Sequence, residues 1–199
     1  MKESTFEYAE DLISKAMMFA IAAHSGQFRK DNRTPAIIHA MEAAVIVASM
    51  TSDPEVMAAA ILHDTIEDTD VTAEQIEKMF GDRVSALVAT ETEDKHREIS
   101  AADSWMLRKQ ESIDELSHIT DINAKILWLG DKLSNMRSFY RMYVKQGSAM
   151  WDRFHQKDPA KHEWYYRAIL RELAVLSDEE AYKEYSWLVD QIFGKEGTA

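Results

Sequence analysis

Apolar residues recur three and four positions apart along almost the whole of this 199-residue chain. That spacing matches the turn of an α-helix, and no stretch alternates apolar and polar residues as a half-buried strand does. Only 3 prolines and 6 glycines interrupt the pattern, and they stand where helices are expected to begin or end. With 46% apolar residues the chain can fill a core of its own. We therefore expect an all-α fold in which residues 1–199 form a single helical-bundle domain.

Capping signals set the expected helix boundaries. Asp53 and Asp158 each precede a proline, which is typical of an N-cap followed by the first helical residue. A capping box opens at Thr72 and another at Ser177. The predicted helices, with a polar loop at 91–102 and a frayed tail at 194–199, are 8–24, 36–50, 54–65, 72–81, 82–90, 103–116, 120–146, 158–176 and 177–193.

Composition excludes several kinds of site and partner. The chain has no cysteine, so disulfides, thiolate metal sites, iron–sulfur clusters and a cysteine nucleophile are ruled out. Its 35 acidic and 23 basic residues give a net charge of −12, which opposes binding of a nucleic-acid polymer. The longest apolar run, 16–23, is far shorter than the roughly 20 residues of a membrane span. We expect a soluble, cytoplasmic protein with a small-molecule partner and no membrane partner.

Side chains capable of acid/base and metal chemistry cluster in the segment 61–68. His63, Asp64, Glu67 and Asp68 fall within six positions there, and on a helix His63 shares a face with Glu67. Imidazole beside carboxylate is the ligand mix expected for manganese, iron or zinc at a site without sulfur. One of the two later acids could serve as a base toward water. A structural histidine and solvated helix-end charges are the alternatives.

Two residues elsewhere could complete such a site. His39 begins an otherwise apolar helix, and Asp131 follows the apolar segment 126–130. A buried carboxylate is costly unless it is paired or holds a metal. Asn135 and Ser138 lie four and seven positions further on and extend one polar edge of that helix. The structural alternatives are a hydrogen-bonded core histidine and a salt bridge between the aspartate and an arginine.

Basic residues form a second set of candidates. Arg29 and Lys30 lie in the loop between the first two predicted helices, and Lys95 lies in the later polar loop. Arg108 and Lys109 follow in the next predicted helix. Such side chains can hold phosphates, and arginine can also stack on a base. Ordinary solvated charge is the alternative for each of them.

Taken in order, these residues resemble the HD phosphohydrolase superfamily, in which a distant histidine precedes an adjacent His-Asp pair and a far aspartate. The finer resemblance is to the hydrolase domain of RelA/SpoT proteins and to small alarmone hydrolases, including the metazoan SpoT homologue. It is carried by HSGQFRK at 24–30, LHDTIEDT at 62–69, FGDRV at 80–84 and GDKLSNMR at 130–137. The resemblance implies an HD-domain helical fold and removal of the 3′-pyrophosphate from ppGpp or pppGpp with a manganese ion.

The resemblance also implies a role for each matched position. The implied ligands of a divalent metal, Mn²⁺, are His39, His63, Asp64 and Asp131. Glu67 and Asp68 would orient and activate the attacking water. The implied contacts to the nucleotide are Arg29 and Lys30 at the guanine, Asn135 and Ser138 at the ribose, and Lys95, Arg108 and Lys109 at the phosphates.

The chain departs from the family pattern beside His39. Where the family usually has P-Y-x-x-H-P, residues 35–40 read PAIIHA, so Ala36 and Ala40 change the wall of the site. Gly130 stands where alanine is usual. These departures bear on the substrate more than on the metal. The sequence leaves open an HD hydrolase of a nucleoside monophosphate or NADPH, a metal-binding helical module without catalysis, and a homodimer.

Overall fold

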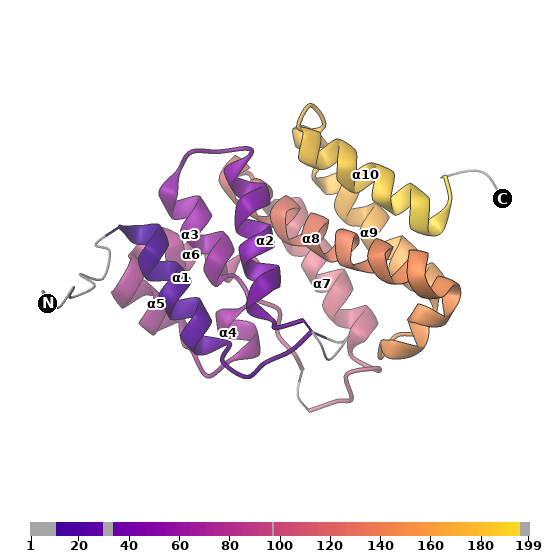
Figure 1. Cartoon of the computed structure of the whole chain (residues 1–199), viewed down its shortest axis with the longest axis horizontal. Helices are drawn as coiled ribbons and strands as arrows, with labels where there is room; N and C mark the ends of the chain where they lie inside the picture. Colours follow the sequence, from indigo (N-terminus) through magenta and orange to yellow (C-terminus); the bar gives the residue numbers. More distant parts are fainter. Residues whose placement is uncertain (1–10, 30–33, 97, 196–199) are drawn as a thin grey trace, which may run out of the picture.

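The computed structural model describes residues 11–29, 34–96 and 98–195. Within these residues the regular structure is helical, with one isolated bridge between Phe28 and Pro35 and no strand. The expected all-α fold is confirmed. Helices α2 and α8 pack against each other near the middle, with α1, α3, α5 and α6 on one side and α7, α9 and α10 on the other (Figure 1). The elements are α1 (Leu12–Ala23), α2 (Ile37–Ala48), α3 (Pro54–Leu62), α4 (Thr65–Asp68), α5 (Ala73–Phe80), α6 (Asp82–Ala89), α7 (Trp105–His118), α8 (Ile122–Gln146), the 3₁₀ helix η1 (Gly147–Arg153), α9 (Pro159–Glu172), the 3₁₀ helix η2 (Ala174–Leu176) and α10 (Glu180–Phe193).

Three of the four predicted caps form. The carboxylate of Asp53 accepts a hydrogen bond from the amide of Glu55, and Asp158 caps α9 in the same way. At the start of α5, Thr72 and Gln75 make both hydrogen bonds of a capping box. Each cap satisfies an amide that the first helical turn leaves without an intrahelical partner. These helix starts follow from local chemistry alone.

The capping box predicted at Ser177 is wrong. Its backbone is helical, with φ −60° and ψ −21°, because its amide bonds to the carbonyl of Ala174 and continues the turn of η2. An N-cap residue needs an extended backbone. Helix α10 therefore begins only at Glu180, and its N-cap, Glu179, makes no side-chain capping bond.

Other boundaries differ from the expected ones by a few residues. The helix predicted at 54–65 is broken after Leu62, where the hydroxyl of Thr65 donates to the carbonyl of Leu62. No sequence signal predicted the 3₁₀ turn η1. Residues 8–10 of the first predicted helix and 196–199 of the predicted tail lie outside the described residues. The carbonyl of Gly194 accepts a hydrogen bond from Arg167, so that end of the tail is attached to the fold.

The close approach of α2 to α8 depends on a glycine. A Cβ atom at Gly130 would lie 2.6 Å from Cγ2 of Val47 and 3.0 Å from the backbone oxygen of Ala43. Both distances are shorter than ordinary van der Waals contact, so any larger side chain would push the helices apart. Gly130 directly precedes Asp131, and α2 carries His39. The departure from the family's alanine therefore sets the spacing of two candidate ligands.

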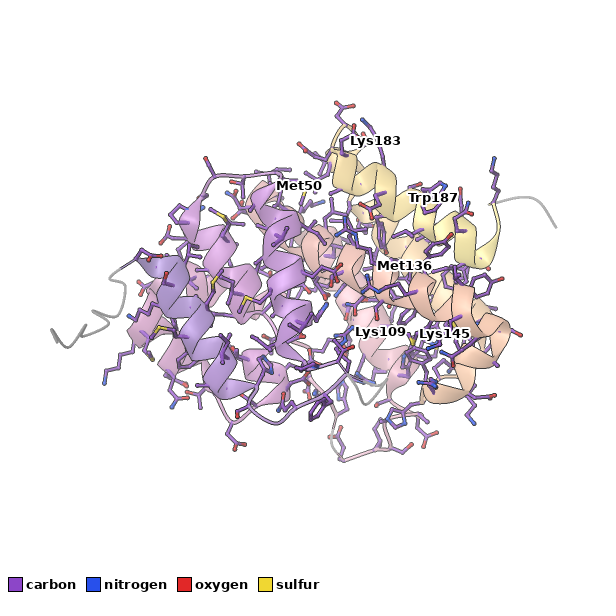
Figure 2. All side chains as sticks on the ribbon, viewed as in Figure 1. Met50, Lys109, Met136, Lys145, Lys183 and Trp187 are labelled. Atoms are coloured by element: carbon purple, nitrogen blue, oxygen red, sulfur yellow. The ribbon has the colours of Figure 1, made fainter. Side chains whose placement is uncertain are left out.

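We expect Gly130→Ala to lower the free energy of unfolding by about 1–3 kcal/mol, because overpacking a tight core costs that much. The gain in helix propensity from alanine, up to about 1 kcal/mol, offsets part of this cost. Urea unfolding followed by circular dichroism measures the change. The matched control is Lys145→Ala near the exposed end of the same helix (Figure 2). Equal free energies of unfolding for Gly130→Ala and the wild type would show that α2 can move away from α8 at this point without cost.

None of the helices in the described ranges combines the length and the apolarity that crossing a bilayer requires.

Candidate metal centre and active site

Three side chains from three helical segments converge on one point. His39 lies in the first turn of α2, His63 follows the end of α3, and Asp131 lies in the middle of α8. All three are buried, and each offers a ligand atom within 4.8 Å of the other two. Nε2 of His39 lies 2.8 Å from Oδ1 of Asp131 and 3.3 Å from Nε2 of His63. Residues 92 positions apart in the sequence thus share one site.

Asp64 stands at the open side of this group. Its carboxylate lies 3.2 Å from Nε2 of His63 and 3.6 Å from Nε2 of His39, and it is more exposed than the other three side chains. Asp64 lies in the short turn that separates α3 from α4, directly after His63. The structure therefore brings all four predicted metal ligands together.

A hydrogen bond to the backbone orients His63 so that one ring nitrogen faces the site. Its Nδ1 lies 2.8 Å from the carbonyl of Ala60, which can only accept, so Nδ1 carries the hydrogen and Nε2 faces the site. Burial opposes a charge on this ring, but the carboxylates of Asp64 and Asp131 outweigh it and raise the pKa of His63 well above its usual value. Two imidazoles and two carboxylates around one point are a donor set that a divalent metal takes, and a metal there would replace the proton on Nε2. The residues present therefore fit the metal that the resemblance implies.

Asp131 is held by partners on its own helix. Its Oδ2 accepts a hydrogen bond of 2.5 Å from Lys132, and its Oδ1 accepts one of 2.6 Å from Asn135. Burial opposes ionisation of this carboxyl, but the neighbouring Lys132 ammonium outweighs burial, so the pKa of Asp131 is well below its usual value. The carboxylate is thus charged and oriented before any metal arrives.

Glu67 and Asp68 lie beside the four candidate ligands, on α4. Burial, reinforced by the charge of Asp64, raises the pKa of Glu67 to about 7. A carboxyl group with that pKa can accept a proton near neutral pH. Asp68 is more exposed and bonds to Nζ of Lys95 at 2.5 Å, while the same ammonium lies 3.6 Å from Glu67. Of the two acids, Glu67 has the properties of a general base.

A cavity of about 570 Å³ opens from the candidate ligands. Arg29 lies on its wall and donates a 2.7 Å hydrogen bond from Nη2 to the side-chain oxygen of Asn135. Ser138 lines the same wall one turn further along α8. Ala36 also lines the cavity, so the small residue found in place of the family's tyrosine adds open space there. Lys30 lies outside the described residues.

The other predicted basic residues are already paired with carboxylates. Arg108 and Lys109 line the cavity, but both pair with the carboxylate of Glu93, which also accepts a hydrogen bond from Ser112. Lys95 lines a neighbouring hollow of about 480 Å³ rather than the main cavity, and its ammonium is held by the acids of α4. Each of these side chains has further N–H donors that a phosphate could take.

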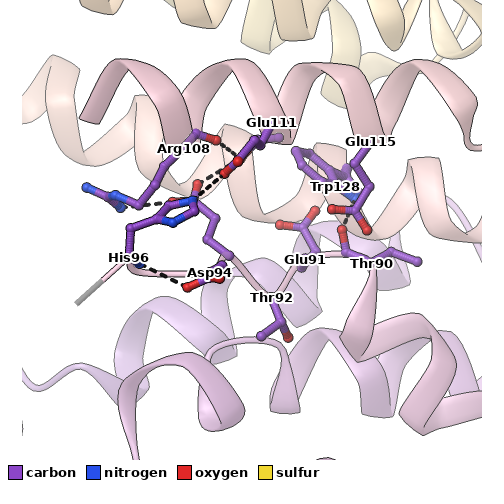
Figure 3. A pocket seen from close by; sticks show the side chains of 11 residues that line it. Thr90, Glu91, Thr92, Asp94, His96, Arg108, Glu111, Glu115 and Trp128 are labelled. Atoms are coloured by element: carbon purple, nitrogen blue, oxygen red, sulfur yellow. Dashed lines mark hydrogen bonds and ion pairs between the residues drawn. The ribbon is translucent and has the colours of Figure 1, made fainter. Parts of the chain in front are cut away.

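Sequence reasoning missed the residues behind Asp131. Glu91 is buried and pairs with Lys132 at 3.1 Å, so Lys132 bridges this glutamate and the candidate ligand. Glu91 borders a smaller pocket of about 270 Å³ between the loop after α6 and helix α7, where the indole of Trp128 donates to the carbonyl of Thr90 (Figure 3). No motif marks Glu91, because it lies in a loop that is polar throughout.

Sequence reasoning also missed the far wall of the cavity. Helix α8 and the helices and turns after it supply this wall with aromatic and histidine side chains, which are Phe139 of α8 and, further along the chain, Phe154, His155, His162, Tyr165 and Tyr166. Their helical spacing is the same as that of ordinary core residues, and only the packing of η1 and α9 beside α8 turns them toward the site. The C-terminal helices therefore contribute to the cavity as well as to the core.

This constellation of two histidines and two aspartates in a helical bundle defines the HD-domain class. The family model described as an HD domain matches residues 16–155. The chain belongs to the HD-domain family.

Relatives of known activity lie close in sequence. The chain is 38% identical over 133 residues to the guanosine-3′,5′-bis(diphosphate) 3′-pyrophosphohydrolase MESH1 of Xenopus tropicalis, a match that covers 65% of this chain and 70% of that protein. It is also 32% identical over 134 residues to a GTP pyrophosphokinase of Myxococcus xanthus, a match that covers 66% of this chain. The matched part spans only 18% of that longer relative.

Solved structures show the same architecture. The structure of a metazoan ortholog of SpoT that hydrolyzes ppGpp matches with a TM-score of 0.71 at 25% identity, covering 96% of this chain and 99% of that one. A protein of Listeria monocytogenes matches with a TM-score of 0.65 at 31% identity, covering 79% of this chain and 94% of that one.

Proposed function

We propose that this protein is a metal-dependent hydrolase that removes the 3′-pyrophosphate from the guanosine alarmones ppGpp and pppGpp, which leaves GDP or GTP and pyrophosphate. The observation that carries the proposal is the convergence of His39, His63 and Asp131 beside a glutamate whose pKa is about 7. The names of the relatives from Xenopus tropicalis and of the metazoan SpoT ortholog supply the substrate class. In the proposal the helices α1 to α10 act as one HD domain in the cytoplasm.

The proposed ligands of the metal are His39, His63, Asp64 and Asp131, and the proposed metal is Mn²⁺. Imidazole and carboxylate oxygen suit this ion. When bound, such an ion supplies positive charge that polarises the reacting phosphate and lowers the pKa of water. Because the site already gathers two carboxylates and two ring nitrogens, little rearrangement is needed to receive it.

The proposed mechanism assigns the proton transfer to Glu67. Its carboxylate accepts the proton of the attacking water as the oxygen–phosphorus bond forms. The bond to the ribose 3′-oxygen breaks, and that oxygen keeps the electron pair and takes up a proton from solvent water. Lys95 lies between Glu67 and Asp68, so it can hold the two acids in place despite their repulsion. Asp68 would orient the water. Water enters from the exposed side, where Asp64 lies.

The proposed substrate contacts lie around the cavity wall. Arg29 and Asn135, already hydrogen-bonded to each other, would meet the guanosine, with Ser138 toward the ribose. Lys30, which follows Arg29 in the sequence, is a further proposed contact to the guanine. Arg108, Lys109 and Lys95 would bind phosphate through the donors that Glu93 and the acids of α4 do not take. This local positive charge would offset the repulsion that a net charge of −12 exerts on an anionic substrate.

One assay tests the proposal directly. The purified protein is incubated with ppGpp, GMP, dAMP and NADPH in the presence of Mn²⁺, with an EDTA control, and the products are identified by mass. GDP and pyrophosphate from ppGpp, lost in EDTA, are the expected result. Turnover of another compound alone would keep the metal site and overturn the substrate. Metal binding without cleavage of any compound would instead identify a non-catalytic module.

We expect Arg29→Ala to raise KM for ppGpp by about 10–100-fold, because a hydrogen bond to a charged group is worth roughly 1.5–3 kcal/mol. The value of kcat should change much less, since Arg29 lies on the cavity wall and not among the candidate ligands. Steady-state kinetics separate the two constants. The matched control is Arg171→Ala on α9. An unchanged KM for Arg29→Ala would exclude Arg29 as a nucleotide contact.

A further inference from the structure

We infer that Ser134 and Glu42 are positioning residues for the metal ligand His39, which they hold with Nδ1 protonated and Nε2 free for the metal. This inference rests on the metal site of the proposed function. It adds two residues that neither touch the candidate metal position nor line the substrate cavity.

The three side chains form a continuous chain of hydrogen bonds between α2 and α8. Nδ1 of His39 lies 2.8 Å from Oγ of Ser134, and Oγ of Ser134 lies 2.8 Å from Oε2 of Glu42. Ser134 is 1% exposed and His39 is 5% exposed. Burial at this level leaves little room for water to replace either partner.

The number of hydrogens decides the direction of these bonds. A carboxylate can only accept, so the single hydrogen of the Ser134 hydroxyl goes to Glu42. The hydroxyl oxygen then has only lone pairs to offer His39, and Nδ1 must be the donor. The other ring nitrogen, Nε2, is left to face Asp131 at 2.8 Å and His63 at 3.3 Å. Glu42 thus sets the tautomer of His39 through one intervening hydroxyl.

Two arginines stabilise Glu42 in the role of acceptor. Arg137 and Arg141, both on α8, lie 3.6 Å and 3.5 Å from its carboxylate. Arg137 is itself held in a bidentate pair with Glu184 of α10, at 2.7 Å and 2.6 Å. The chain of contacts therefore runs from the C-terminal helix to the metal ligand. Through these contacts, the packing of α10 against α8 would help to hold the ring of His39 in one orientation.

A metal-bound histidine commonly donates its second ring nitrogen to an oxygen acceptor, and loss of that acceptor costs about 10–100-fold in metal affinity. We therefore expect Ser134→Ala to weaken Mn²⁺ binding by about that factor. Ser134→Thr keeps the hydroxyl and should restore most of the affinity. Glu42→Gln should weaken binding in the same direction but less, because the amide can still accept through its oxygen.

The experiment measures the Mn²⁺ dissociation constant by isothermal titration calorimetry and the thermal unfolding midpoint of the metal-free proteins. The double variant Ser134→Ala/Glu42→Gln decides whether the two residues act in series. If Glu42 acts only through Ser134, the second change adds nothing to the first. The matched controls are Ser117→Ala on α7 and Glu77→Gln on α5, both exposed and remote from the site.

The expected result for Ser134→Ala is a higher Mn²⁺ dissociation constant and an unchanged unfolding midpoint of the metal-free protein. Ser134→Thr should restore the affinity, and the double variant should bind Mn²⁺ no more weakly than Ser134→Ala. An unchanged Mn²⁺ dissociation constant in Ser134→Ala would overturn the inference while the proposed function stands. Additive losses in the double variant, or a lower metal-free midpoint without threonine rescue, would also overturn it by showing a structural role. A wild type that binds Mn²⁺ but cleaves no alarmone would overturn the proposed function alone.

Discussion

Asp131→Asn is expected to abolish both metal uptake and hydrolysis. The substitution keeps the size of the side chain and removes the charged oxygen that faces His39 and His63. A ligand lost from the metal itself should cost more than the roughly 10–100-fold known for its outer partners. Because a bound cation would supply several kcal/mol of charge stabilisation to the proposed reaction, the rate should fall about 10³-fold or more.

Calorimetric titration with Mn²⁺ and a product assay measure the two losses separately. Asp152→Asn, an exposed aspartate in η1, is the matched control and should behave as the wild type. The fold should survive, because an asparagine at position 131 can still accept a hydrogen bond from Lys132. Full activity of Asp131→Asn in EDTA would contradict the proposed mechanism.

Glu67→Gln is expected to lower kcat by about 10²–10⁴-fold, the usual contribution of a positioned general base. The amide occupies the same space but cannot accept the proton of the attacking water. Mn²⁺ affinity should remain within a few-fold of the wild type, because Glu67 is not among the converging ligands. The combination of retained metal and lost turnover separates this residue from the four ligands.

The pH profile gives a second test of Glu67. Its pKa is about 7 in the metal-free protein, raised by burial and by the charge of Asp64. A base works only when deprotonated, so kcat should fall as the pH drops through this pKa, and a bound cation would move the fall to lower pH. The fall should be absent from the residual activity of Glu67→Gln. Glu74→Gln on the exposed face of α5 is the control. A profile that is identical in Glu67→Gln and the wild type would assign the proton transfer to another group.

Local signals in the chain were enough for most of the fold. Asp53, Asp158 and Thr72 cap helices as predicted, because a cap depends only on residues within the next turn. The capping box predicted at Ser177 is wrong because this position also depends on the residues before it. The preceding turn η2 holds the Ser177 backbone in a helical conformation, and a pattern of four residues carries no information about that turn.

The sequence by itself determined the helical class and the identity of the candidate ligands, since periodicity, capping and residue chemistry are all written in short segments. It could not determine which polar residues support them. Glu42, Ser134 and Glu91 look like ordinary surface residues in the sequence, and they become partners of the site only where α2, α8 and the loop after α6 meet. The raised pKa of Glu67 also follows from burial, which no local pattern encodes. Tertiary packing decided these features because distance and exposure to water, which control both hydrogen bonding and charge, depend on contacts between distant segments.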